Sequence, residues 1–96
     1  MKTTLDYLNQ VITEHREIEN DNQLALFLGI TRQAVYQYKG GRNMSVLVAI
    51  KVAVALGINP METVSATLWA QAQSKEEQDL WAEEYRLRTE RNPRET

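Results

Sequence analysis

Four side chains that can form hydrogen bonds with the edges of planar polar groups lie close together near the middle of this chain. They occur in the segment TRQAVYQYKG, and they are Arg32, Gln33, Tyr36 and Gln37. Residues three and four positions apart are neighbours on a helix, so these four would share one face. Arginine and glutamine have forked ends that match the base edges exposed in the DNA major groove. The pattern therefore predicts a base-reading face, with Arg32 suited to guanine and the two glutamines suited to adenine.

Further polar and basic residues around this face predict contacts with a phosphate backbone. They are Asn22, Lys39, Arg42 and Asn43. Half or more of the hydrogen bonds from proteins to DNA go to phosphate and sugar, from side chains of these kinds. The alternative for Lys39, Arg42 and Asn43 is an ordinary solvated loop. Asp21 fits this interpretation least well, because its carboxylate would repel phosphate.

Charge is distributed unevenly along the 96 residues, although the formal net charge is only −2. Residues 1–21 carry two basic and five acidic side chains, and residues 62–96 carry five basic and eight acidic ones. Residues 22–61 carry four basic side chains and no acidic one. DNA responds to the local field of the face that it meets, so this acid-free stretch favours the predicted interface.

The elements that would position these residues are all helical, which predicts an all-α fold. Cap residues and apolar periodicity indicate six helices. The first is capped by Thr3 or Thr4 and ends near Arg16. The others are expected from the cap Asn20 to Leu28, from Arg32 to Lys39, from the cap Ser45 to Leu56, from the cap Asn59 to about Ala72, and from Lys75 to Arg91. The last two could also form one long helix. Residues 92–96 are expected to fray.

Local patterns also predict helix starts and burial. Capping boxes are expected at Asn20 with Gln23, at Asn59 with Glu62, and at Ser74 with Glu77. The second helix would bury Leu24, Ala25, Phe27 and Leu28, and the third would bury Val35 and Tyr38. Residues 46–56 are apolar on nearly every side, so we expect that helix in the middle of the bundle. Within it, Lys51 would reach the surface or meet an acid from the first or fifth helix.

Two stretches, LALFLGITRQAVYQYKGG and AIKVAVALGINPMET, carry a resemblance to a known family. Ala25 is small where two helices must cross, and Gly29 stands where their connection needs glycine. Together they resemble the DNA-binding domain of the phage lambda repressor and Cro family, also called the xenobiotic-response-element family. The resemblance covers about residues 5–65, and it implies that Thr31, as the cap of the third helix, contacts a DNA phosphate.

This resemblance implies a fold, a domain organisation and a function. The fold would be a lambda-repressor-like bundle of five helices containing a helix-turn-helix, with an extra C-terminal helix. Residues 1–65 would form the DNA-binding domain, and residues 66–96 a helical extension that packs on it. The function would be that of a cytoplasmic transcriptional repressor, a homodimer that reads a palindromic operator in double-stranded DNA. The alternative is a protein-interaction module on the same fold, such as an antitoxin, an anti-repressor or an adaptor.

A second group of apolar and aromatic residues lies near the C-terminus. Its members are Trp69, Leu80, Trp81 and Tyr85. Two interpretations stay open: these side chains close the core of one chain, or they form a surface for a second copy or another protein.

The composition argues against several other classes. The chain has no cysteine, which excludes disulfides and thiolate zinc sites. His15 is the only histidine, so a metal site is not expected, and we expect His15 at the surface or at a helix end. No serine has an evident base, and Gly40-Gly41 lacks the continuation of a phosphate-binding loop. We therefore expect neither enzymatic activity nor a cofactor. The N-terminus lacks a secretory signal, and residues 46–56 are too short to span a membrane.

Overall fold

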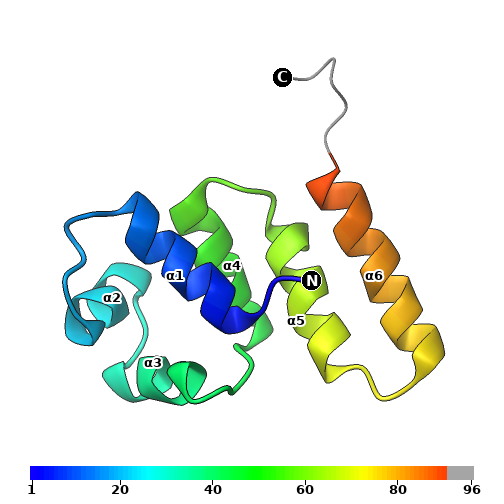
Figure 1. Ribbon diagram of the computed structural model, residues 1–96, viewed down its shortest axis with the longest axis horizontal. Coiled ribbons are helices and arrows are strands. Elements are labelled where there is room, and N and C mark those ends of the chain that lie inside the picture. The colour runs from blue at the N-terminus through cyan, green and yellow to red at the C-terminus, as the bar shows by residue number, and fades with distance from the viewer. Residues whose placement is uncertain (91–96) are drawn as a thin grey trace.

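The computed structural model describes residues 1–90, which form six α-helices and no strand (Figure 1). The helices are α1 (Thr4–Glu14), α2 (Asp21–Leu28), α3 (Arg32–Lys39), α4 (Val46–Leu56), α5 (Pro60–Gln71) and α6 (Lys75–Thr89). The predicted all-α class is confirmed, and α5 and α6 are separate helices. The first and last helices are about two residues shorter than expected. The expected fraying of residues 92–96 lies outside the described residues.

Every helix begins at a side-chain cap, and this is why the predicted starts agree with the observed ones. The caps are Thr3, Asn20, Thr31, Ser45, Asn59 and Ser74, and each accepts a hydrogen bond from a backbone N–H in the first turn. Such a bond satisfies one of the donors that a helix start leaves without a partner.

The three expected capping boxes are not formed as predicted. Gln23 accepts from the N–H of Glu19, and Glu77 accepts from the N–H of Gln73, one residue before the cap in each case. The Glu62 carboxylate accepts from a tyrosine of α1. The complete box in α1 pairs Thr3 with Asp6, and its bonds from Thr3 lower the pKa of the Asp6 carboxyl.

The helices form a flat body, with principal extents of 37 × 36 × 17 Å. Figure 1 looks down the shortest of these axes and shows α5 between α4 and α6, with α1 crossing in front of α4. The pair formed by α2 and α3 packs at the other end of the molecule from α6. As a result, the candidate DNA-binding helix and the C-terminal helix occupy different edges.

Helix α4 packs against α1, α2 and α5, as expected for a helix in the middle of the bundle, whereas α5 packs mainly between α4 and α6. Five consecutive residues of α5, Thr63–Thr67, are buried, because α4 and α6 cover them from two sides. Their side chains are small, which lets both neighbours approach closely. In contrast, α4 leaves Leu47 and Val54 exposed by 63% and 72%. The apolar composition of α4 therefore did not predict its exposed face, because burial depends on which sides of a helix its neighbours cover.

Phe27 is a second correction, since it is 40% exposed rather than buried. The other three residues expected on the buried face of α2, Leu24, Ala25 and Leu28, are buried as predicted. The ring of His15, the residue that ends α1, lies 4.5 Å from the Phe27 ring, and its Nε2 is 2.8 Å from the carbonyl oxygen of Ala55. These two rings cover the junction of α1, α2 and α4 from outside.

The connection between α2 and α3 is short and well defined. Gly29 has a φ of 68°, in the left-handed region, and the N–H of Ile30 bonds back to the carbonyl of Ala25 at 2.9 Å. The Lys51 ammonium donates to the carbonyl of Gly29 at 2.7 Å. Lys51 therefore reaches outward from α4, as one alternative predicted, and ties α4 to this connection.

Candidate nucleic-acid interface

Helix α3 has two distinct faces. Val35 and Tyr38 point into the core and are buried, as predicted from their spacing. Arg32 and Gln33 are exposed on the opposite face, and Tyr36 is 77% exposed. In Figure 1, α3 lies along the lower edge of the molecule. The candidate base-reading side chains at the start of α3 are therefore accessible from outside.

An open hollow lies beside this face, between α3 and the beginning of α2. Asn20, Asp21 and Asn22 line it from the α2 side, and Arg32 and Tyr36 line it from the α3 side. The hollow brings the predicted phosphate contact Asn22 together with two of the predicted base-reading residues. We call it the α2–α3 hollow.

A second hollow lies at the other end of α3, next to the loop that leads to α4. Its lining includes Gln37, Arg42, Asn43 and Ser45. The Arg42 Nη1 donates to the Oε1 of Gln37 at 3.0 Å. The amide oxygen that Gln37 would offer to an adenine therefore already accepts one hydrogen bond, from a predicted phosphate contact. Gln33 lines neither hollow and lies exposed on α3.

Lys39, another predicted phosphate contact, is also engaged within the chain. Its Nζ lies 2.5 Å from the Oδ1 of Asp21. The two side chains are 40% and 43% exposed, so the pair is at the surface. The Asp21 carboxylate, which fits the predicted interface least well, thus has a specific cationic partner from α3.

Thr31 is the cap of α3, and its Oγ1 accepts from the N–H of Ala34 at 3.0 Å. The hydroxyl proton of an accepting threonine is still available for a donor bond, which suits a contact with a phosphate oxygen. Asn43 and Asn22 are exposed. These positions agree with a role at a backbone, although they fit a solvated surface equally well.

Met44 supports this site, although the sequence patterns described above did not single it out. It is 1% exposed. Its backbone N–H donates to the Oγ1 of Thr4 at 3.1 Å, and its carbonyl accepts from Gln71 at 3.4 Å. An apolar residue just before the Ser45 cap is the signal that was available, since such residues pack back onto the first turns of the helix. Met44 thereby holds the loop that carries Arg42 and Asn43.

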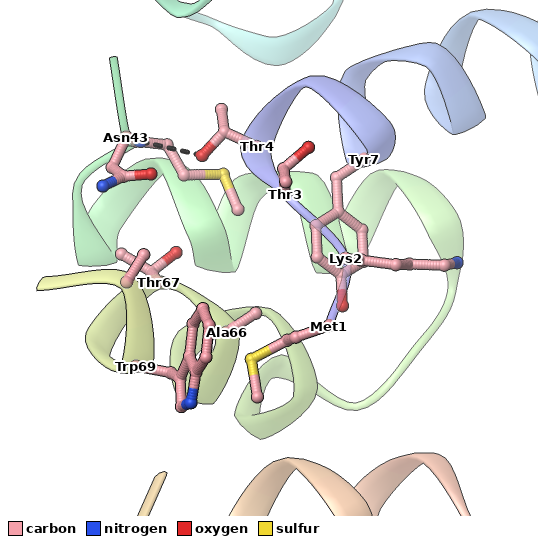
Figure 2. Close-up of a pocket in the computed structure, with 11 residues that line it drawn as sticks. Met1, Lys2, Thr3, Thr4, Tyr7, Asn43, Ala66, Thr67 and Trp69 are labelled. Atoms are coloured by element: carbon pink, nitrogen blue, oxygen red, sulfur yellow. Dashed lines mark hydrogen bonds between the residues drawn. The ribbon is translucent and has the colours of Figure 1, made fainter. Parts of the chain in front are cut away.

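The aromatic residues near the C-terminus do not form one exposed surface. Trp81 and Tyr85 are half-buried, and Tyr85 packs against the core. Trp69 is also half-buried and lines a cavity of about 50 Å³ between α5 and the first residues of the chain; Figure 2 shows it near Met1. Leu80 is 57% exposed. Tyr85 thus contributes to the core of one chain, and Leu80 faces outward.

Comparisons with protein-family models, curated proteins and solved structures give no match to this chain. Within residues 1–90, no group of three His, Asp or Glu side chains is placed to hold a metal ion. In the same range, no helix combines the length and apolar character needed to cross a membrane.

Proposed function

We propose that this chain is a sequence-specific DNA-binding regulator of transcription, with α2 and α3 acting as a helix-turn-helix. The observation that carries the proposal is the two-faced character of α3. Its inner face is fixed in the core by Val35 and Tyr38, and its outer face presents Arg32, Gln33 and Tyr36. A short, rigidly capped helix that exposes such side chains suits insertion into the major groove.

Roles follow from the chemistry of each side chain. Arg32 would donate two hydrogen bonds to a guanine, and Gln33 would pair with an adenine through its amide. Gln37 would do the same after Arg42 has moved from its Oε1 to a phosphate. Thr31, Asn22 and Asn43 would contact the backbone and set the register of α3. Occupying an operator in this way would block transcription, which makes a repressor the simplest form of the proposal.

A homodimer would match this mode of binding. Two copies of α3 would then read half-sites roughly 34 Å apart on one side of the DNA. Helix α6 is the candidate contact, because none of its residues is buried and it exposes Leu80 and Leu87. It lies on the opposite side of α5 from α4 (Figure 1), which leaves α3 clear.

The test is selection of bound duplexes from a random pool by the full-length chain. We expect enrichment of a palindromic consensus, and binding to it should weaken steeply as salt rises, because phosphate contacts release counterions. If no duplex is bound more tightly than random DNA, the proposal of sequence-specific binding is wrong.

The second candidate is a protein-interaction module, and one observation favours it. Leu26, Phe27, Ile50 and Val54 expose apolar surface around a hollow between α2 and α4. Exposed apolar patches of this kind often mark protein contacts. Such a module would show no preference among duplexes in the selection, and this separates the two candidates.

A further inference from the structure

The ion pair between Asp21 and Lys39 links the start of α2 to the end of α3, where each charge also complements the dipole of its helix. Asp21 is the first residue of α2, and Lys39 is the last residue of α3. Both side chains are well exposed, and such a pair adds little to stability because water screens it. The start of α2 is already capped by Asn20, and the end of α3 is followed by Gly40, whose N–H bonds back into the helix. The pair therefore contributes little to folding, and its charges bear mainly on what this surface binds.

Its position is informative, because Asp21 lines the α2–α3 hollow with Arg32 and Tyr36. It is also the last acidic residue before the acid-free stretch of residues 22–61. The strongest negative charge in the hollow thus comes from one carboxylate, and that carboxylate holds an ammonium from the candidate DNA-binding helix. A carboxylate oxygen and a phosphate oxygen are both anionic acceptors for such an ammonium.

We propose that Asp21 is an internal competitor of DNA phosphate, which binds Lys39 in the free protein and so limits its sequence-independent attraction to DNA. This inference rests on the proposed function. On binding, a backbone phosphate near the end of α3 takes the Lys39 ammonium from Asp21. The exchange replaces one anionic acceptor by another, so Lys39 adds less affinity than an unpaired lysine would. Asp21 is thus a positioning residue for Lys39 and lowers binding to duplexes of any sequence.

The experiment compares the parent chain with Asp21→Asn, Lys39→Gln and the double variant. Binding to a random duplex is followed by fluorescence anisotropy at several salt concentrations. We expect Asp21→Asn to bind about three- to tenfold more tightly at low salt and to steepen the salt dependence by about one released ion. In the Lys39→Gln background, the same change should give little gain, because the effect of Asp21 passes through Lys39.

Asp79→Asn is the matched control. Asp79 pairs with Lys75 on α6 at 2.8 Å, so this variant removes a carboxylate from an exposed ion pair and changes the net charge equally. We expect its DNA binding to stay close to that of the parent. An equal gain from Asp21→Asn and Asp79→Asn would overturn the inference, because net charge would then explain the effect. An equal gain from Asp21→Asn with and without Lys39 would also overturn it.

The failure of this inference can be told apart from the failure of the proposed function. If the parent binds its selected duplex but Asp21→Asn behaves like the parent, the inference alone is wrong. If neither chain binds any duplex, the proposed function is wrong and the inference falls with it. Thermal unfolding of each variant shows that it is folded, which we expect because both side chains are well exposed.

Discussion

Two basic side chains of the candidate interface already have partners within the chain. Lys39 is held by Asp21, Arg42 is held by Gln37, and Arg32 faces the hollow that Asp21 lines. A side chain engaged in this way would have to exchange one partner for another in the proposed binding to DNA. The net gain from each contact is then a difference between two interactions, and it is smaller than the contact itself.

Arg32 is the residue whose removal should harm recognition most. We expect Arg32→Ala to weaken binding to the selected operator by about 1–3 kcal/mol and to relax the preference at one base pair. Arg16→Ala is the control, because Arg16 is an exposed arginine in the connection between α1 and α2. Anisotropy titrations at one salt concentration measure both. Equal operator affinities for Arg32→Ala and the parent would contradict the base-reading role.

Glycine should be required at position 29 for stability, because the backbone there adopts a left-handed conformation. A Cβ added there would lie 3.7 Å from the Lys51 Nζ, an ordinary contact, so space is not the obstacle. Its φ of 68° is unfavourable for alanine by roughly 1–2 kcal/mol, which corresponds to a fall in Tm of several degrees. We expect Gly29→Asn to lose less, because asparagine tolerates this region better. Urea unfolding distinguishes the two, and a Gly29→Ala chain as stable as the parent would refute the argument.

At the scale of elements, the cap residues made the helix starts predictable from the sequence. The packing of the helices against one another could not be predicted from these local patterns. Each helix start has its own cap, so a few adjacent residues were sufficient to locate it. The burial of Thr63–Thr67 in α5 depends on α4 and α6, which lie on either side of it, and no local pattern encodes that. In the same way, periodicity predicted the outer face of α3, but the pairing of Asp21 with Lys39 depends on how α2 and α3 cross.

The contact between α1 and α5 provides a test at this scale. The Tyr7 hydroxyl donates to the Glu62 carboxylate at 2.7 Å, and Tyr7 is fully buried. We expect Tyr7→Phe to lower the free energy of unfolding by about 1–3 kcal/mol, because the partly buried carboxylate loses its donor. Urea unfolding at neutral pH measures the loss. Unchanged stability would show that water replaces the tyrosine at no cost.

Tyr7 should also make stability depend on alkaline pH. Burial, and then the bond to Glu62, raise the pKa of Tyr7 above its ordinary value of 10.0. The folded chain therefore holds the phenol proton more tightly than the unfolded chain does. This contribution is complete below pH 10 and is lost as the pH rises above that value. The decline between pH 9 and 11 should be smaller in Tyr7→Phe than in the parent, and equal declines would contradict this assignment.

At the scale of the whole molecule, α3 and α6 occupy separate edges, so binding and association should be separable. We expect Leu80→Lys to weaken self-association and the binding of a palindromic duplex, while the chain stays folded, because Leu80 is largely exposed. Tyr85→Ala is the contrasting variant, since Tyr85 packs against the core and its loss should lower stability. Sedimentation velocity measures the association. If the parent chain stays monomeric on its operator, the proposal of a homodimer is wrong.

The order in which the helices meet has a consequence for how fast this chain folds. The most extensive packing joins neighbours in the sequence: α5 with α6, α4 with α5, and α2 with α3. Helix α2 also contacts α4, and α1 returns over the longest stretch of chain, to meet α4 and to place Tyr7 against Glu62. Chains dominated by such local contacts fold in microseconds to milliseconds. Refolding should therefore be rapid, with the docking of α1 as the slowest step.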